Sequence, residues 1–380
     1  MFDKLSSHSG KNGTFRQLRK VCHFDMIRAN QQHQGGTMMA KKVLVTEPIN
    51  EKGIEYLKEN GYEVIMGSGP EQETLIHECA DCDGALTRNG KFTRYVLEHC
   101  PKLKVVAMHG VGVDCIDVEA ATDLKIQITN AAESNQSSVA EYAIGLILML
   151  AKRSIDYNNR MKLGEMNEVR KVYGNDVQGK TLGIIGMGNI GSQVAKMASF
   201  GLHMKVIGYN RHIQGVQETE FGILTNDMQQ VISSADFLSL HLPGGSSTRH
   251  LIGEKELSWM KESAFLINTG RGEVIDEEAL IRLLKEGKIR GAALDVFEGN
   301  LPKADNPLLS MENVIVTPHT AAFTTEALER MAYQAALGVV EVLEGRPVTY
   351  PVNKIHDNFE ENKSIAAIMN YYRYEFPQKK

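Results

Sequence analysis

Hydrophobic and polar positions along the chain fall into two series of strand–helix units. In the first series, short runs rich in Val, Ile and Leu predict strands at residues 42–47, 62–66, 85–87, 103–108 and 126–130. In the second series, similar runs predict strands at residues 181–186, 204–209, 237–242, 264–269, 292–297 and 314–317. Nearly continuous apolar strands that alternate with helices are typical of parallel sheets covered on both faces. The pattern therefore predicts an α/β protein with two sheets.

Helical spacing of apolar residues fills most of the gaps between these strands. The shorter helices are predicted at residues 52–60, 71–79, 92–100, 190–200, 228–235 and 277–286. Two longer helices, at 138–152 and 324–343, carry the chain from the first series to the second and back. Ser138 and Glu141 form a capping-box pattern at the start of the first of these.

The two long helices predict a chain divided into two lobes. We expect one lobe from residues 39–137 plus 324–353 and the other from residues 138–323. Residues 156–174 are polar and show no core face, so they form either a solvated linker or an arm that contacts a second copy of the chain.

Both ends of the chain differ from the two lobes. Residues 1–38 are rich in Ser, Asn, Gln and His, which indicates a disordered leader or a start codon assigned too far upstream. Their basic, acid-poor composition leaves a transit peptide as the alternative. For residues 354–380 we expect a frayed tail, with contact to a partner as the alternative.

Composition and charge narrow the class of protein. Of the 380 residues, 42% are hydrophobic and 23% charged, which excludes a collagen-like or largely disordered chain. The 42 basic and 47 acidic residues give a net charge of −5, without the basic surplus that a nucleic-acid groove requires. The longest apolar run, Ala143 to Ala151, is much shorter than the about 20 residues of a membrane-spanning helix. We therefore expect neither nucleic-acid binding nor a membrane segment.

The five cysteines are an odd number, which favours free thiols in a reducing compartment and hence a cytoplasmic protein. Cys79 and Cys82 form a C-x-x-C with no second pair to complete a zinc site. We expect half-buried free thiols there and no metal site in the protein.

The strongest chemical signal is a glycine-rich turn. Gly186, Gly188 and Gly191 fit the pattern G-x-G-x-x-G, and the turn follows a predicted strand and opens a predicted helix. The first glycine permits the tight turn, the second lets the backbone approach a pyrophosphate, and the third allows close packing of helix and strand. The free N–H groups at the helix N-terminus favour phosphate. The sequence therefore predicts a dinucleotide site.

The end of the next strand bears on the type of dinucleotide. NAD sites usually carry a carboxylate there for the ribose 2′-hydroxyl, whereas this chain has Asn210 and Arg211. A guanidinium can pair with a 2′-phosphate, which a carboxylate would repel. We therefore favour NADP over NAD. The alternative is that Arg211 stacks on the adenine without discriminating between the two.

Three polar groups follow buried strands of the second series. They are the segment 268–272 with Arg271, the segment 295–297 with Asp295, and the segment 317–319 with His319. Open α/β sheets bind ligands at the carboxyl ends of their strands. An Arg there can hold a carboxylate, and a His can move one proton near neutral pH. Together with a nicotinamide, such a pair suits hydride exchange at a 2-hydroxy or 2-keto acid.

Seven motifs in the right order resemble the D-isomer-specific 2-hydroxyacid dehydrogenase family, which includes phosphoglycerate dehydrogenases and glyoxylate/hydroxypyruvate reductases. The resemblance covers residues 41–353. The motifs lie at residues 110–114, 130–141, 186–191, 240–252, 268–272, 295–297 and 317–319. The resemblance implies a Rossmann-like NAD(P)-binding domain inserted into a flavodoxin-like substrate-binding domain. It also implies a homodimer that oxidises or reduces a small D-2-hydroxy or 2-keto acid.

The resemblance further implies roles for individual residues. Arg271 would orient the substrate and His319 would act as the acid/base. Arg88 and the backbone N–H groups of Val111 and Gly112 would bind the substrate with Arg271. The cofactor site would comprise Gly186, Gly188, Asn189, Ile190, Gly191, Asn210, Arg211, His241, Pro243, Thr248, Thr269, Gly270, Asp295 and His319.

One departure from the family pattern concerns the acid/base. The family places a Glu next to the catalytic His, and this chain has Asn300 at that position. An amide can orient the ring, but without a charge we expect the pKa of His319 to be lower than in relatives with Glu. Related formate dehydrogenases also carry an amide there. Glu298 is the alternative to Asn300 as the partner of His319. The alternative to an active dehydrogenase is a catalytically weak dinucleotide-binding regulator.

Overall fold

The computed structural model describes residues 40–355. The expected leader and residues 356–380 of the expected tail lie outside the described residues. Within the described part, the α/β fold with parallel sheets is confirmed.

The first sheet has five parallel strands with the flavodoxin-like order 2-1-3-4-5. Its strands are β1 (Lys42–Val45), β2 (Glu63–Met66), β3 (Gly84–Thr87), β4 (Val105–Met108) and β5 (Gln127–Thr129). All four strand pairs are parallel, so their carboxyl ends lie at one edge of the sheet. That edge carries Arg88 and the loop 109–114.

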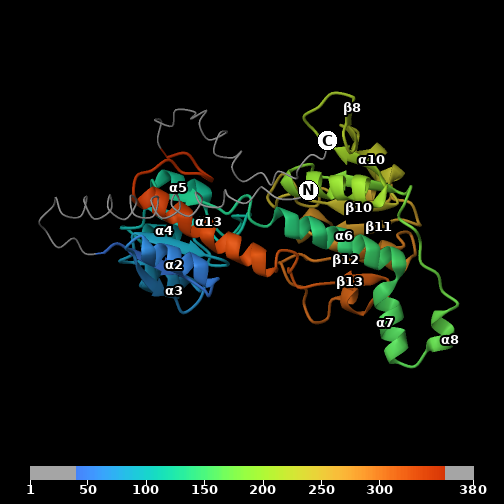
Figure 1. Ribbon diagram of the computed structural model, residues 1–380, viewed down its shortest axis with the longest axis horizontal. Coiled ribbons are helices and arrows are strands. Elements are labelled where there is room, and N and C mark those ends of the chain that lie inside the picture. The colour runs from blue at the N-terminus through green and yellow to red at the C-terminus, as the bar shows by residue number, and fades with distance from the viewer. Residues whose placement is uncertain (1–39, 356–380) are drawn as a thin grey trace, which may run out of the picture. The chain divides into compact units, whose positions relative to one another are not determined.

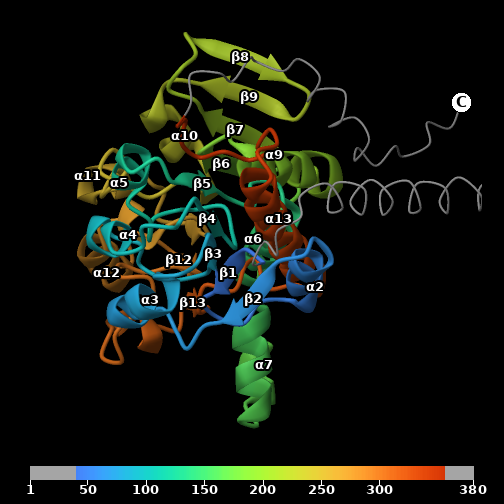
Figure 2. The ribbon, with the colours of Figure 1, turned by 90° about the vertical axis from the view of Figure 1, so that its left-hand side faces the viewer.

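Helices cover both faces of the first sheet (Figure 2). They are α2 (Glu51–Glu59), α3 (Gln72–Cys79), α4 (Arg94–Glu98), α5 (Val118–Asp123) and the returning helix α13 (Thr325–Leu343). α13 packs Ala335, Ala336, Val339 and Val340 against buried residues of β1, β3 and β4. It meets α2 so closely that a Cβ at Gly53 would lie 2.7 Å from the Ala332 carbonyl oxygen. Close packing of this kind fixes α13 against the first sheet.

The second sheet has eight strands in the order β13-β12-β11-β10-β6-β7-β9-β8. They are β6 (Thr181–Ile185), β7 (Lys205–Tyr209), β8 (Val216–Thr219), β9 (Gly222–Thr225), β10 (Phe237–Leu240), β11 (Phe265–Asn268), β12 (Gly291–Leu294) and β13 (Val314–Val316). Every pair except β8–β9 is parallel. With β6 counted as the first strand and the antiparallel edge strand β8 left out, the order from β9 to β12 is 3-2-1-4-5-6, the Rossmann arrangement.

The helices of the second sheet include α6 (Gln136–Lys152), which lies along β11 and β12 (Figure 1). The others are α7 (Ser154–Lys162), α8 (Met166–Val169), α9 (Asn189–Lys196) with a π-helical end (Met197–Gly201), α10 (Met228–Ser234), α11 (Glu254–Leu257) and α12 (Glu277–Lys285). Short 3-10 turns occupy Gly272–Val274 and Pro307–Ser310. Ser138 on α6 and Thr324 before α13 are joined by a hydrogen bond of 3.0 Å between their hydroxyls, where the chain crosses between the sheets.

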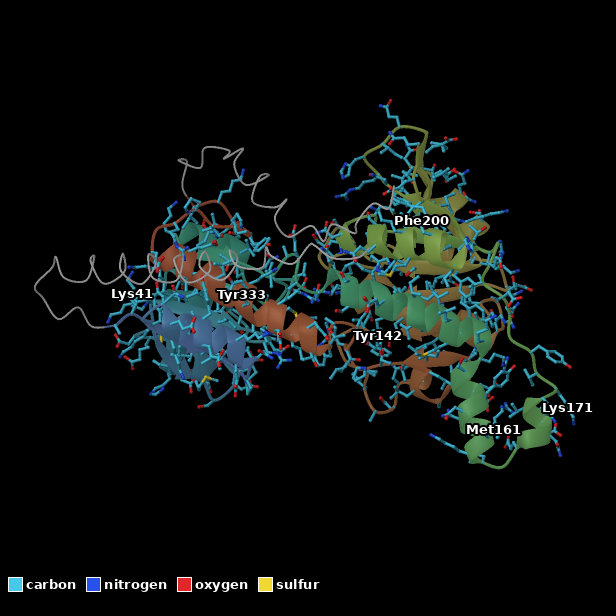
Figure 3. All side chains as sticks on the ribbon, in the orientation of Figure 1. Lys41, Tyr142, Met161, Lys171, Phe200 and Tyr333 are labelled. Carbon is cyan, nitrogen blue, oxygen red and sulfur yellow. The ribbon has the colours of Figure 1, made fainter. Side chains whose placement is uncertain are left out.

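Several expectations about local structure were wrong. We predicted no helix in the segment 156–174, but it contains most of α7 and all of α8, and Asp156 pairs with Arg153 and Arg160. No residue of α7 is buried, so ion pairs, not an apolar face, support this helix. Met161 and Lys171 lie away from the strands of the second sheet (Figure 3).

The expected capping box at Ser138 is also wrong. The N-cap of α6 is Asn135, which makes no side-chain capping bond, and Ser138 lies inside the helix. The sequence pattern also did not indicate α5, α11 or the antiparallel pair β8–β9, which extends the second sheet beyond β7 (Figure 2). β8 is mostly exposed and has no continuous apolar face, so it lacks the signal that identified the buried strands.

Candidate functional site

A cavity of about 670 Å³ lies at the carboxyl ends of both sheets. Residues that follow β3 and β4 line one side of it, and residues that follow β6, β10, β11 and β12 line the other. The expected site residues that line it are Arg88, Val111, Gly112, Gly188, Asn189, Ile190, His241, Pro243, Thr269, Gly270, Arg271, Asp295, Asn300 and His319. The structure therefore brings most of the expected site together around one space.

The glycine turn between β6 and α9 needs its glycines for two different reasons. Gly186 has φ +102°, and a Cβ there would lie 2.5 Å from the His241 carbonyl oxygen. A Cβ at Gly191 would overlap the Gly186 carbonyl oxygen, so both positions are set by contacts inside the protein. A Cβ at Gly188, the N-cap of α9, would meet nothing within 4 Å. The backbone at Gly188 is therefore open to a ligand in the cavity.

The end of β7 forms a small polar turn outside the cavity-lining set. Asn210 Oδ1 accepts from the His212 backbone N–H at 3.0 Å, and Arg211 Nε lies 3.1 Å from His212 Nε2. Arg211 and His212 are both exposed. A cationic group at the end of this strand is accessible to a ligand that extends from the glycine turn.

Two residues assigned to the cofactor site make contacts within the protein. Thr248 is buried, and its hydroxyl donates to the Pro243 carbonyl at 2.8 Å, so it shapes the loop after β10. His241 Nε2 lies 2.9 Å from the Ser239 hydroxyl, and burial lowers the pKa of His241 to about 4. His241 is therefore a neutral ring at the cavity wall.

Arg271 is held at the cavity by the turn that follows β11. The buried Asn268 shapes that turn, because its amide accepts from the Gly270 N–H and donates to the Arg271 carbonyl. Arg271 Nε donates to Asp114 at 2.9 Å, and its Nη1 donates to the Gly270 carbonyl at 2.9 Å. A Cβ at Gly112 would overlap Arg271 Nη2. The guanidinium thus lies against the backbone of the loop 109–114.

His319 is oriented by Asn300. Its Nδ1 lies 2.5 Å from Asn300 Oδ1, and because that oxygen only accepts, Nδ1 carries the proton. Nε2 is then the ring nitrogen left to accept a proton. Burial, followed by the nearby Arg271 guanidinium, lowers the pKa of His319 from its ordinary value. The alternative partner Glu298 pairs instead with His250.

Asp295 holds the segment that carries His319. Its fully buried carboxylate accepts from the Thr317 hydroxyl at 2.6 Å and from the backbone N–H groups of Thr320 and Ala321, each at 2.9 Å. His319 also donates its backbone N–H to the Asp295 carbonyl at 2.8 Å and has φ +55°. These bonds stabilise a left-handed conformation that a non-glycine residue rarely adopts.

Arg88 reaches the cavity from the first sheet. Its Nη1 donates to the Pro48 carbonyl at 3.1 Å, and its guanidinium lies 5.9 Å from the centre of the Phe323 ring. Glu47, which the sequence did not single out, accepts the backbone N–H groups of Arg88 and Asn89 and fixes this loop.

Sequence reasoning assigned no role to several residues of the cavity wall, among them His109, Asp114 and Asn135, although Asp114 and Asn135 lie inside two of the motifs. Asp114 is 157 positions from Arg271, so no local pattern indicates their pairing. His109 and Asn135 are each more than nine-tenths buried. Each carries a polar atom without a hydrogen-bond partner, His109 Nε2 and Asn135 Oδ1.

The described residues contain no group of three or more His, Cys, Asp or Glu side chains arranged to hold a metal ion. Cys79 and Cys82 are free thiols, as expected, but both are fully buried, not half-buried, because they pack in the core of the first sheet. Among residues 40–355, no helix combines the length and apolar character that crossing a bilayer demands.

Comparison with known proteins places the chain among dehydrogenases. Residues 144–321 match the family model for the NAD-binding domain of D-isomer specific 2-hydroxyacid dehydrogenases. A D-3-phosphoglycerate dehydrogenase from Methanocaldococcus jannaschii is 44% identical over 82% of this chain, which spans only 59% of that relative's length. A glyoxylate reductase from Thermococcus litoralis is 38% identical over 83% of this chain and 98% of its own.

A solved structure shows the same architecture. It is an NADPH-dependent glyoxylate/hydroxypyruvate reductase from Sinorhizobium meliloti in complex with NADP and malonate. The match has a TM-score of 0.74 and 27% identity, and covers 83% of this chain and 98% of the other.

Proposed function

The chain belongs to the D-isomer specific 2-hydroxyacid dehydrogenase family, and on that premise we propose that it interconverts a small D-2-hydroxy acid and its 2-keto acid with NAD(P). The observation that carries the proposal is that Arg271, His319 and the glycine turn line one cavity. The test is turnover of pyruvate, glyoxylate, hydroxypyruvate and phosphohydroxypyruvate with each cofactor. Dinucleotide binding without turnover of any of them would support a regulator instead.

The residues at the glycine turn fit a dinucleotide. The space in front of Gly188 is open, and the N–H groups of Asn189 and Ile190 belong to the first turn of α9, so they have no carbonyl one turn earlier to bond. They would hold the pyrophosphate. Thr269, Gly270, Asp295 and His319 line the same cavity. When bound, the nicotinamide supplies or accepts the hydride at C2 of the substrate.

The protein's own residues hold the substrate and move the proton. Arg271, held against Gly112 and Asp114, binds the substrate carboxylate together with the backbone N–H groups of Val111 and Gly112. His319 Nε2 takes the proton of the C2 hydroxyl during oxidation and returns it during reduction. Asn300 keeps Nδ1 protonated and so keeps Nε2 directed to this exchange. Asp295 is a positioning residue for the loop that carries His319.

The lowered pKa of His319 predicts the pH dependence of the two directions. Reduction requires protonated His319, so its kcat/KM should decline as pH rises through a pKa below the ordinary 6.5, while oxidation rises over the same interval. In Asn300→Glu, a carboxylate beside Nδ1 should raise that pKa and move the decline of reduction upward by about one pH unit. The measurement is the pH–rate profile of both directions, with Asn300→Gln as the uncharged control. An unchanged profile in Asn300→Glu would mean that position 300 does not set the pKa of His319.

We favour NADP as the preferred cofactor, supported by the exposed Arg211 and His212 after β7 and by the lack of an acid there. In Arg211→Asp, the ratio of kcat/KM for NADP to that for NAD should fall by about 10- to 100-fold, because an attractive charge becomes a repulsive one. Arg211→Lys keeps the charge and should change the ratio much less. A strong NAD preference in the unmodified protein would contradict this assignment.

We also propose that the protein forms a homodimer and acts in the cytoplasm. We assign the chain to a homodimer in which the exposed α7 and its neighbours contact the second copy, supported by the exposed Met161, Leu163 and Tyr173. The four free cysteines in the described residues suit a reducing compartment such as the cytoplasm. Analytical ultracentrifugation of the full chain tests the dimer.

A further inference from the structure

An anionic side chain lines the cavity in which the proposed chemistry binds an acid. It is Asp114, which lies in the loop after β4. The other carboxylate among the described residues of the cavity wall is Asp295, which is fully buried and bonded to the loop that carries His319. Half of the Asp114 side chain is exposed, and its charge by itself repels a substrate carboxylate. The presence of Asp114 therefore requires an explanation other than attraction of the substrate.

Asp114 lies on a turn that backbone hydrogen bonds hold to the first sheet. The Ile116 N–H donates to the Val113 carbonyl at 2.9 Å and closes the turn. The Phe92 N–H donates to the Cys115 carbonyl at 3.0 Å, and Phe92 is fully buried in the core of the first sheet. These bonds fix the backbone of Asp114, so its short side chain has few positions available.

The carboxylate of Asp114 is also confined by glycine backbone on two sides. A Cβ at Gly112 would lie 2.8 Å from Asp114 Oδ2, and a Cβ at Gly244 would lie 2.8 Å from Asp114 Oδ1. Gly112 belongs to the same loop, whereas Gly244 belongs to the loop after β10 in the second sheet. The carboxylate therefore occupies a narrow space between a loop of one lobe and a loop of the other.

Arg271 reaches this confined carboxylate with a long side chain that has many rotamers. Its Nε donates to Asp114 Oδ2 at 2.9 Å, and its Nη1 donates to the neighbouring Gly270 carbonyl at 2.9 Å. The bond to Asp114 is thus the one that ties the guanidinium to a distant part of the chain. A guanidinium is planar and carries its N–H donors in a fixed fork. Holding Nε therefore orients the whole fork and leaves further N–H groups on Nη1 and Nη2 available.

We propose that Asp114 is a positioning residue for Arg271, whose Nε it holds so that the remaining guanidinium donors face the substrate carboxylate; this rests on the proposed function. Asp114 acts through its hydrogen bond and against its own charge. The charge weakens the binding of an acid, whereas the bond holds Arg271 in the reactive geometry. Displacement of such a group by about 1 Å lowers the rate by about 100-fold, while a partly exposed ion pair contributes little to folding.

The charge of Asp114 has a separate effect on His319. Burial and Arg271 lower the pKa of His319, whereas Asp295 and Asp114 raise it. Removal of the Asp114 carboxylate should therefore lower the pKa of His319 further, and the decline of reduction should move to lower pH. The kcat/KM on the plateau below this decline is independent of the shift, so it reports the geometry of Arg271.

The test compares Asp114→Asn with Asp114→Ala. Both variants remove the same charge, but the amide oxygen of Asn still accepts from Arg271 Nε. For the keto acid that turns over fastest, plateau kcat/KM should stay within about threefold in Asp114→Asn and fall by about 10- to 100-fold in Asp114→Ala. The decline should move to lower pH in both. Asp123→Ala removes an exposed aspartate that is paired with Arg94 outside the cavity, so this matched control should change neither quantity.

Thermal unfolding and the dissociation constant of NADPH separate positioning from a general structural role. We expect both to be nearly unchanged in Asp114→Ala, and a parallel loss of stability or NADPH affinity would overturn the proposal. Equal losses of plateau kcat/KM in the two variants would overturn it as well. Unchanged or increased plateau kcat/KM in Asp114→Ala would show that Asp114 acts by its charge alone.

Binding of oxamate, an unreactive analogue of pyruvate, distinguishes this proposal from the proposed function. If no keto acid turns over, calorimetry of oxamate with NADPH present replaces the kinetics. Weaker binding in Asp114→Ala, with binding retained in Asp114→Asn, would support the positioning role although the dehydrogenase activity fails. Equal binding to the unmodified protein and both variants, or binding to none of them, would overturn the positioning role.

Discussion

His319→Ala is expected to lower kcat by about 10²- to 10⁴-fold in both directions, because it removes the group that exchanges the proton with the substrate oxygen. The side chain is partly exposed, and its ring makes one hydrogen bond, to Asn300. We therefore expect little change in the free energy of unfolding. The measurements are steady-state kinetics of reduction and oxidation, together with thermal unfolding.

The dissociation constant of NADPH separates the acid/base role of His319 from cofactor binding. His319 lines the cavity, so a contact with the cofactor would weaken NADPH binding in the same variant. We expect that constant to change by less than about threefold, far less than the loss in kcat. Asn300→Ala is the companion variant. It keeps the imidazole but frees its orientation, so its loss in kcat should be smaller than that of His319→Ala. A kcat within a few-fold of wild type in His319→Ala would exclude this residue as the acid/base.

Whether an element could be predicted from the sequence depends on whether its side chains are buried. Strands such as β6 and β11 are fully or largely buried, so their runs of Val, Ile and Leu identify them without knowledge of the tertiary structure. α7 has no buried residue and rests on the pairs of Asp156 with Arg153 and Arg160, so its apolar pattern gives no helical signal. The sequence does not predict β8 either, because β8 is an exposed strand at the edge of the sheet and has no run of buried apolar residues.

Some features of the candidate site could likewise be predicted from the sequence, and others could not. Arg271 follows the buried strand β11 and His319 follows the half-buried edge strand β13, and strand ends meet at one edge of a parallel sheet, so their convergence follows from topology. The contacts of Asp295 with Thr317, Thr320 and Ala321 depend on the path of the loop after β13. His109 lies outside the motifs, and Asn135 lies inside the motif 130–141 without a role assigned to it. The burial of these two side chains depends on the tertiary structure, which no local pattern indicates.

Gly112→Ala is expected to lower kcat/KM by about 100-fold or more while leaving stability nearly unchanged. Gly112 does not have positive φ, so alanine brings no backbone strain there. Its Cβ would overlap Arg271 Nη2 and lie 2.8 Å from Asp114 Oδ2. The end of a flexible arginine can move away at little cost in folding energy, but a guanidinium displaced by about 1 Å no longer holds the substrate carboxylate in the reactive geometry.

A double-mutant cycle assigns that loss to the overlap with Arg271. Arg271→Ala alone should also lower kcat/KM by a large factor, and adding Gly112→Ala to it should cost less than about threefold, because the clashing group is gone. Gly145→Ala is the matched control: its Cβ meets nothing within 4 Å and lies on α6 outside the cavity, so kcat/KM should not change. If Gly112→Ala costs the same factor with and without Arg271, the loop 109–114 acts on the substrate independently of the guanidinium. The position of Arg271 against Gly112 would then not be what makes glycine necessary here.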